Sequence, residues 1–551
     1  MNRVLISTVC AAMLAGPVFA EGNGGYCEGG ETGAVTTTDV KGHAAQITIS
    51  GGIDIDSVFR SDGVAAVLNR ESGSDTNLNN TRVGDQSDSD SFWSPLVTLR
   101  VDAMLARHVS GVIELENARL RSNISKGNDN VQQGGGPADR FEALDDPGDG
   151  STGWGTDANE DLIGGRDIMP AVRLAYIQVD EFLSPCLSAK IGIFDEVWDL
   201  RGNGNPFFMG LRTDGAGYAS VGPVTEAFGS FGQQWAYSNI LGAGGRGLYR
   251  DSAEAGGLEF WYKADESLKV ELYYLNLVET GFLHEDEATY GVHALYNIHD
   301  SPSMMEGFFS VISNDSDHNR MYTIGGGADY WVDRAELFGE VIYQWGDYGD
   351  EGAVFNNTLA GADGRIDQRA WAGYVGARYN FDVQMKPYAE VMYQYISGDN
   401  GAHANKGDTN RDFVSYEDND SEMILEDNLY GLDVQSNYWK VQMEMGLTSS
   451  ICADDDLRVK FQYAYNQLVT APDRVERTDL QRGRGLSKQL GQEVDFHADW
   501  AYSDSLRFGL GVGYLFSGGF WNDPNGFGAD RTNTGISDNM WMVMVDAQLR
   551  F

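Results

Sequence analysis

The sequence predicts an all-β fold, namely a single transmembrane antiparallel β-barrel of about 18 strands with short periplasmic turns and long extracellular loops. Three observations support this prediction. Apolar and polar residues alternate with period two in segments that recur from residue 45 to the C-terminus, which is typical of strands with one apolar and one polar face. Every second connection between these segments is short. Aromatic residues gather at the segment ends, where a bilayer has its interfaces.

The first 20 residues have the form of a secretory signal peptide. Arg3 supplies the positive start, an apolar run follows, and Val18-Phe19-Ala20 forms a small-x-small cleavage site. The apolar run is too short to cross a bilayer as a helix. We therefore expect residues 1–20 to be a signal peptide, residues 21–44, rich in Gly and Thr, to be a flexible periplasmic tail, and residues 45–551 to be the barrel.

The composition favours a large exported β-protein. The formal net charge is −43, and the chain has 69 glycines and 11% aromatic residues. Such acidity argues against nucleic acids and anionic lipid surfaces as partners. It fits solvated loops rich in Asp, Asn and Gly. The composition is not that of a disordered chain.

The last residues show the alternation most clearly. From Trp541 to Phe551 every second residue is apolar, and the intervening Asp546, Gln548 and Arg550 are polar. This strand alone is equally compatible with a soluble sandwich and a membrane barrel. Its aromatic C-terminal residue resembles that of bacterial outer-membrane barrels, whose assembly machinery reads this end. A soluble sandwich has no reason to alternate short turns with long loops, so the membrane barrel is the better interpretation.

Eighteen segments carry the pattern, and most are long enough to cross a bilayer at the usual tilt. They are 45–59, 94–105, 108–122, 168–181, 186–196, 254–264, 267–280, 287–299, 303–315, 320–332, 334–346, 367–381, 386–398, 430–447, 455–469, 487–501, 505–517 and 538–551. An even number of strands places both termini on the short-turn side, in the periplasm. Loops 123–167 and 399–429 are then extracellular.

If the apolar parity of each strand faces lipid, the polar parity lines the lumen. A water-filled channel removes most of the cost of burying so many charges. The predicted pore-lining residues are Arg100, Glu114, Glu116, Arg173, Lys190, Glu336, Glu340, Arg378, Glu390, Lys440, Arg458, Lys460, Glu493, Asp495, His497, Asp499 and Arg507. The predicted lumen is mixed in sign, so opposed patches would orient a polar solute.

Each of these residues has a simpler interpretation, an ion pair that stiffens the wall, and for any single residue that interpretation is favoured. His497 between Asp495 and Asp499 could in principle act as a base or bind a metal. No serine accompanies them in the sequence, and a titrating lumen cluster is the favoured interpretation. We therefore predict no enzyme activity, no metal site and no cofactor.

Loop 197–253 is the longest connection and carries several aromatic residues with few charges among them. A long apolar loop should not be fully solvated. It is expected either to fold into the barrel or to form a lid with other loops. Cys27, Cys186 and Cys452 remain after cleavage. We expect any native disulfide to use Cys27, with three free thiols as the alternative, because turns on opposite sides of a wide barrel cannot be bridged.

Several stretches resemble the alginate-export family of outer-membrane porins. They are Val172 to Ile177, Lys190 to Gly192, Asp199 to Gly202 and Pro387 to Asp399, within about residues 170–400. The resemblance implies an eighteen-stranded barrel that passes a polysaccharide or other small polar solutes. The alginate member has a strongly basic pore, whereas this lumen is mixed and the loops are acidic. Alginate itself is therefore a poor candidate solute.

The function that follows is a channel for passive, partly selective diffusion of small polar solutes or saccharides across the outer membrane of a Gram-negative bacterium. Its expected partners are outer-membrane lipid, the barrel-assembly machinery and the solute, with no nucleic acid. The alternative is a structural or adhesive surface barrel whose long acidic loops carry the function. Acidic loops at the mouth predict weak cation preference at low salt.

Overall fold

The structure is a computed structural model. It describes residues 34–40, 43–61, 90–116, 122–123, 171–195, 254–265, 267–278, 287–299, 301–314, 319–350, 365–398, 409–411, 413, 421–426, 434, 437–450, 456–470, 487–520 and 539–551. The predicted signal peptide, loops 123–167 and 197–253, Cys27 and Cys452 lie outside or largely outside these residues. Cys186 is a half-buried free thiol.

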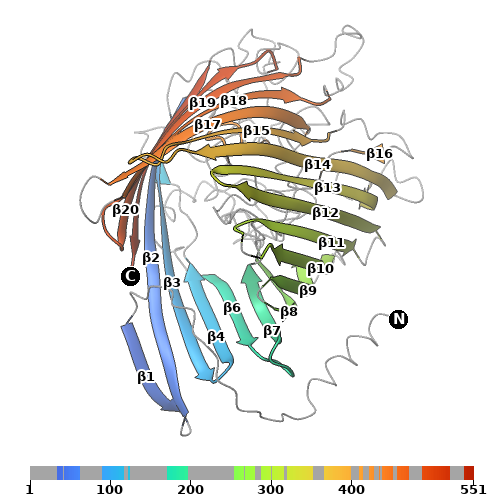
Figure 1. The fold of residues 1–551 in the computed structure, drawn as a ribbon, viewed down its shortest axis with the longest axis vertical. Helices are drawn as coiled ribbons and strands as arrows, with labels where there is room; N and C mark the ends of the chain where they lie inside the picture. Colours follow the sequence, from blue (N-terminus) through green and yellow to red (C-terminus); the bar gives the residue numbers. More distant parts are fainter. Residues whose placement is uncertain are drawn as a thin grey trace, which may run out of the picture. The chain divides into compact units, whose positions relative to one another are not determined.

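In this part of the chain the regular elements are β-strands (Figure 1). They are β1 (Ala34–Val40), β2 (His43–Arg60), β3 (Asp90–Ala106), β4 (Val109–Glu116), β5 (Ser122–Asn123), β6 (Ala171–Val179), β7 (Leu187–Asp195), β8 (Glu254–Lys263), β9 (Leu268–Val278), β10 (Glu287–Asn297), β11 (Met304–Asn314), β12 (Asn319–Val332), β13 (Ala335–Asp350), β14 (Arg365–Asn380), β15 (Tyr388–Ile396), β16 (Thr409–Asn410), β17 (Tyr438–Ser450), β18 (Asp456–Leu468), β19 (Gln489–Ala501), β20 (Leu506–Ser517) and β21 (Met540–Arg550). Among the described residues, no helix is long and apolar enough to cross a membrane.

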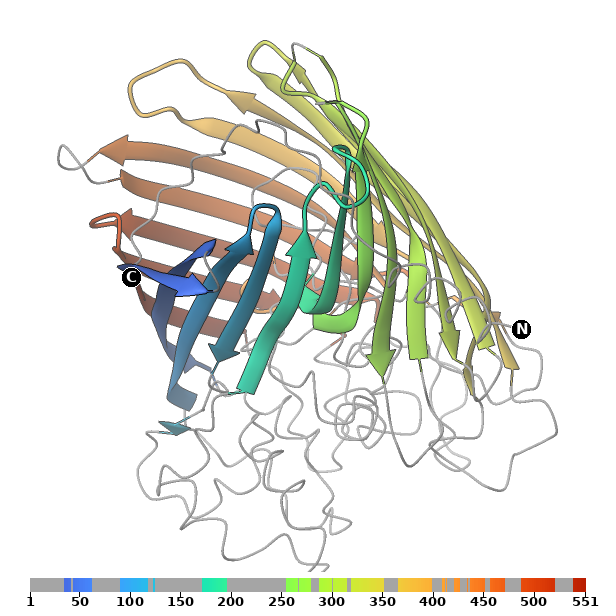
Figure 2. The same cartoon turned by 90° about the horizontal axis from the view of Figure 1, so that it is seen from below.

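The predicted fold class is confirmed, because the sheet closes as an antiparallel barrel of 18 strands. Figure 2 shows its strands following one another around the sheet. Strand β2 closes the barrel by pairing with β3 on one side and with the last strand, β21, on the other. Closure leaves these strands without free edges. The short β1, β5 and β16 are additional to the 18.

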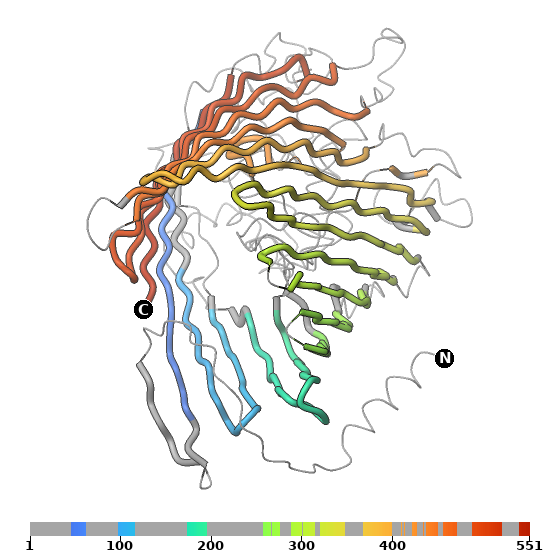
Figure 3. Tube along the Cα trace, in the orientation of Figure 1, coloured from blue at the N-terminus to red at the C-terminus, as the bar shows by residue number. Residues whose placement is uncertain are grey.

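Residues 34–40 differ from the predicted flexible tail because they form β1. This segment holds the β-branched run Val35-Thr36-Thr37-Thr38, which favours extended backbone. Strand β1 pairs with residues 43–49 of β2, whereas β21 pairs with residues 52–60. Figure 3 shows β2 continuing past the C-terminus of the chain. The β1–β2 hairpin therefore extends the sheet beyond the end of β21.

Burial confirms the predicted alternation of faces. In β13, Glu336, Glu340 and Gln344 are buried, whereas Leu337 and Val341 are 53% and 60% exposed. An apolar side chain with that exposure on a closed barrel faces the lipid. Aromatic residues gather at the ends of this outer face, as predicted. Examples are Trp371, stacked on Tyr395 at 4.1 Å between ring centroids, and Phe381 and Phe551 at the short-turn end.

The short turns gather at one end of the barrel and are closed by local hydrogen bonds. Asp265 accepts hydrogen bonds from the Ser267 hydroxyl at 2.6 Å and from the Ser267 and Leu268 amides at 2.8 and 3.0 Å. These bonds lower the pKa of its carboxyl group, and the bond from the Ser267 hydroxyl contributes most. Asp333 adopts a φ of 55° between β12 and β13, a conformation that Asp tolerates better than most residues. The assignment of this end to the periplasm stays a prediction.

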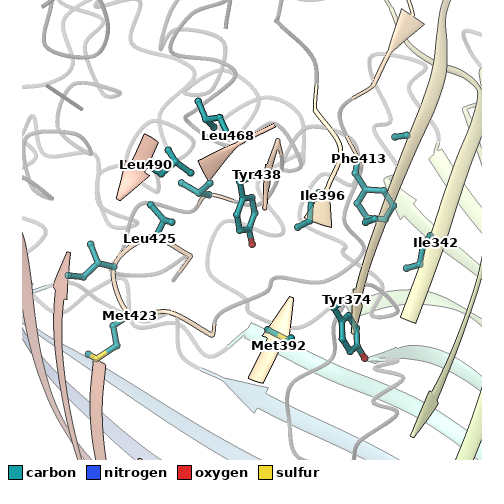
Figure 4. Packing of buried hydrophobic residues seen from close by; sticks show 14 of the residues in the cluster. Ile342, Tyr374, Met392, Ile396, Phe413, Met423, Leu425, Tyr438, Leu468 and Leu490 are labelled. Carbon is teal, nitrogen blue, oxygen red and sulfur yellow. The ribbon is translucent and has the colours of Figure 1, made fainter. Parts of the chain in front are cut away.

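The long connection between β15 and β17 differs from the prediction. The predicted strand 430–447 begins only at Tyr438. Residues 421–426 pack instead against inward-facing side chains, within a hydrophobic cluster that includes Phe413, Met423, Leu425 and Leu490 (Figure 4). Part of the predicted extracellular loop 399–429 thus lies inside the barrel, against a wall that carries apolar side chains such as Leu490 and buried polar ones such as Lys440 and Glu493.

Candidate pore constriction

Ion pairs join neighbouring strands along the inner wall. The Arg378 guanidinium lies 3.0 Å from Glu390 and 3.6 Å from Glu444, and it stacks 4.1 Å from the Tyr388 ring centre. The Tyr388 hydroxyl donates a 2.6 Å hydrogen bond to Glu444. These residues occupy adjacent register positions on β14, β15 and β17. The network therefore stiffens this part of the wall, as the simpler interpretation of each charge predicted.

Other predicted lumen residues are paired in the same way. Lys190 lies 2.9 Å from Glu259, and Arg100 lies 3.0 Å from Asp102 and 3.4 Å from Glu114. Lys460 lies 3.5 Å from Glu444 of the Arg378 network. The paired side chains belong to the inward-facing set of residues on their strands. Their role as pore-lining residues stays a prediction.

Other members of the predicted set differ in exposure. Arg458, Asp499 and Arg507 are exposed and His497 is half-buried. The buried members are Glu336, Glu340, Lys440, Glu493 and Asp495. The side chains of Glu116 and Arg173 lie outside the described residues. The structure therefore divides the predicted set into a solvated group and a dry group.

Three members of the dry group, Lys440, Glu493 and Asp495, lie against residues Ser421–Glu426, which we call the latch segment. Lys440 of β17 is fully buried and donates hydrogen bonds to both Glu426 carboxylate oxygens at 2.6 and 2.7 Å and to the Ser421 hydroxyl at 2.5 Å. Glu422 lies 3.6 Å from the same ammonium group. The Tyr438 hydroxyl donates a 2.5 Å bond to Glu426. One lysine of the wall thus holds both acidic side chains of the segment.

Two further strands hold the backbone and the other end of the latch segment. The carboxylate of Glu493 on β19 accepts bonds from the Ile424 and Leu425 amides at 2.6 and 3.0 Å. On β18, Gln462 donates to the Ser421 carbonyl at 2.8 Å and Asn466 donates to Glu422 at 2.7 Å. A carboxylate that accepts two amides fixes the path of the backbone.

The apolar middle of the latch segment lies over β20, whose inner face carries glycines. A Cβ at Gly511 would lie 2.6 Å from the Met423 methyl carbon, and a Cβ at Gly513 would lie 3.0 Å from the Met423 Cβ and 3.4 Å from an Ile424 side-chain carbon. Such distances leave no room for a larger residue. The glycines of β20 therefore form the recess into which Met423 and Ile424 pack.

Burial changes the ionisation of Glu422 in the latch segment. Desolvation, reinforced by nearby Glu426 and Asp495 and opposed by Lys440, raises the pKa of Glu422 from 4.5 to about 8. A docked segment therefore retains a proton that a solvated one would release. This contribution of Glu422 to docking is fully present below about pH 4.5, weakens as the pH rises, and is lost above about pH 8, a change on the order of a few kcal/mol.

Hydrogen exchange should report this linkage. We expect the Ile424 and Leu425 amides to exchange faster at pH 9 than at pH 6, relative to β18 amides and after correction for the intrinsic pH dependence. Glu422→Gln, which carries no titrating group, should reduce the difference. Equal protection at both pH values in the unmodified protein would contradict the assigned linkage.

An acidic row runs across β19, β21 and β2 on the inner wall, with Asp499 exposed, Asp546 half-buried and Asp56 buried. Asp499 of β19 lies opposite Gly509, Gly509 lies opposite Asp546 of β21, and Asp546 lies opposite Asp56 of β2. The Asp546 carboxylate fills the space above Gly509. Like charges that face each other across strands destabilise one another unless counter-ions are present. The row is therefore suited to attract cations.

A buried histidine links three strands elsewhere on the wall. His293 of β10 lies 2.8 Å from Glu271 of β9 and 3.1 Å from Glu306 of β11. The strand that carries His293 was predicted as residues 287–299. The partners of the histidine could not be predicted, because they depend on the register between neighbouring strands. In the described ranges no three His, Cys, Asp or Glu side chains are arranged to hold a metal ion.

Sequence reasoning missed the latch segment and its contacts with Tyr438, Gln462 and Asn466. One signal was present. Met423-Ile424-Leu425 is an apolar triplet between two glutamates in an otherwise polar and acidic loop. Such a triplet is costly to leave in water. It could have indicated a docked loop, but nothing local indicates the surface on which it docks.

Comparisons with known proteins agree with this architecture. A family model described as "Alginate export" matches residues 308–534, which confirms the resemblance to that family. No curated protein matches the sequence. The chain also resembles solved porin structures at low identity. OccAB3 of Acinetobacter baumannii has a TM-score of 0.46 and 9% identity, covering 91% of this chain and 99% of that one. OccK8 (OprE) of Pseudomonas aeruginosa has a TM-score of 0.43 and 8% identity, covering 92% of this chain and 98% of that one.

A third structure, titled an anion-selective porin from Comamonas acidovorans, has a TM-score of 0.39 and 10% identity, covering 92% of this chain and all (100%) of that one. The family match and the closed barrel place the chain in the outer membrane of a Gram-negative bacterium, as predicted.

Proposed function

We propose that this outer-membrane barrel, which resembles the alginate-export family, is a passive channel for small polar solutes with weak cation preference. The observation that carries the proposal is the acidic row on the inner face, formed by exposed Asp499, half-buried Asp546 and buried Asp56. Charged rings of this kind select ions in other channels. The lumen is not strongly basic, so a polyanion such as alginate is a poor solute for it.

Asp499 and Asp546 are better suited to test this proposal than the buried acidic residues of β19. Glu493 and Asp495 lie on the same strand as Asp499, but both are buried, and Glu493 binds the latch segment. Replacing all three would alter docking and pore charge together. Asp499 is exposed and Asp546 is half-buried, so they report on the lumen alone. Arg458, directly opposite Asp499 in register, offers a control of opposite charge.

The test is the reversal potential across a planar bilayer with a salt gradient. We expect mild cation preference near 0.1 M salt, where the Debye length is about 10 Å, and almost none near 1 M, where it is about 3 Å. Replacing Asp499 and Asp546 by asparagine should reduce the preference, whereas Arg458→Gln should increase it. Strong anion selectivity of the unmodified protein would contradict the cation preference. Absence of conductance would favour the structural or adhesive alternative.

A further inference from the structure

The latch segment occupies lumen that would otherwise be open to solvent. Its six residues contact the inner faces of β17, β18, β19 and β20 through Lys440, Gln462, Glu493 and Gly513. These four strands are consecutive in the sheet. The segment therefore narrows the barrel along a continuous part of its wall.

The forces on the docked segment oppose one another. Met423, Ile424 and Leu425 are each at least 95% buried, with 5%, 0% and 0% of their surface exposed, and burial of such side chains typically contributes about 1.5–3 kcal/mol each. Four carboxyl groups, those of Glu422, Glu426, Glu493 and Asp495, are buried at the same place with Lys440. Buried charges carry a desolvation penalty that pairing repays only in part.

Unsatisfied polar atoms show where that penalty lies. One carboxyl oxygen of Glu422 is buried without a hydrogen-bond partner, and the buried carboxyl groups of Glu493 and Asp495 lie beside each other. Undocking would return Glu422 to water and expose the wall beside Asp495. The cost of burying these ionisable groups therefore offsets part of the free energy gained by burying the three apolar side chains, so docking is weaker than those side chains alone would make it.

We propose that the latch segment docks reversibly on the inner face of β17–β20 and that its release widens the channel. This inference rests on the proposed channel function, and it adds a movable constriction to it. Met423 and Ile424 pack into the glycine recess of β20, Glu493 accepts hydrogen bonds from the backbone of the segment, and Lys440 binds its acidic side chains. Release would leave the recess and the adjacent charged wall open to the solute.

A disulfide can hold the segment in place. The Cβ of Met423 and a Cβ built on Gly513 are 3.0 Å apart, so a shift of the segment by several tenths of an ångström brings them to the separation of about 3.5–4.5 Å found in disulfides. We would prepare Met423→Cys/Gly513→Cys in a background in which Cys27, Cys186 and Cys452 are serine. The matched control is Met423→Ser/Gly513→Ser in the same background, which has similar side chains and no bond.

The readout is single-channel conductance in a planar bilayer, with the bond verified by mass spectrometry. The oxidised pair should show one steady low level, and a reductant should raise its mean conductance severalfold, to that of the serine control. Conductance that does not change on reduction, with the bond verified, would overturn the proposal.

A second variant covers the case in which the cysteine pair does not assemble. Met423→Ser/Ile424→Ser/Leu425→Ser removes the apolar contacts and leaves the wall intact. It should show the high conductance level constantly, and conductance equal to the unmodified protein would overturn the proposal. Absence of conductance in the unmodified protein would instead refute the channel function itself.

Discussion

Lys440→Met is expected to release the latch segment and raise the conductance severalfold. Lys440 is fully buried and pairs with both acidic side chains of the segment, Glu426 at 2.6 Å and Glu422 at 3.6 Å. Removing one partner of a buried ion pair typically costs about 3–5 kcal/mol, because the remaining charge is left uncompensated. Single-channel recording would measure the conductance, and hydrogen exchange at Ile424 and Leu425 would measure docking.

The matched control is Lys460→Met on the neighbouring strand. Its side chain is 34% exposed and pairs at 3.5 Å with Glu444, a residue of β17 outside the segment. Partly exposed pairs contribute little, so docking and conductance should be nearly unchanged. Adding Glu426→Gln to Lys440→Met should restore part of the docking by removing the uncompensated charge. A folded Lys440→Met protein with normal conductance and normal amide protection would contradict the assigned role of Lys440.

Deleting Phe551 is expected to reduce strongly the amount of assembled barrel without affecting export across the inner membrane. Phe551 and Gly51 exchange two backbone hydrogen bonds, at 2.9 and 3.0 Å, where β21 meets β2. A Cβ at Gly51 would lie 2.7 Å from the Phe551 ring, so the ring covers this glycine directly. The deletion therefore removes the last link of the closing seam, and an open seam leaves unpaired strand edges.

Heat-modifiable migration of outer-membrane fractions would measure assembly. Phe508→Ala is the matched control, because Phe508 is an outward-facing aromatic residue on β20, 38% exposed, that does not pair across the seam. It should leave the assembled fraction nearly normal. Normal assembly after deletion of Phe551 would show that closure between β2 and β21 does not depend on the terminal residue.

The sequence alone determined the barrel. The predicted segments 334–346 and 455–469 correspond closely to β13 (Ala335–Asp350) and β18 (Asp456–Leu468). A period-two pattern reports which side chains face lipid, and each strand of a closed barrel has one such face. The strand order follows from the chain order, because short turns can join only adjacent antiparallel strands.

The tertiary structure decided which charges meet and which part of the wall is dry. The Arg378, Glu390 and Glu444 network depends on register across three strands, which a one-residue shift would destroy. The latch segment depends on still more distant groups, namely the glycines of β20 and the Glu493 carboxylate, which follow it by about 70 residues or more. A local pattern such as Met423-Ile424-Leu425 carries the tendency to be buried, but the recess that buries it exists only after the barrel has closed.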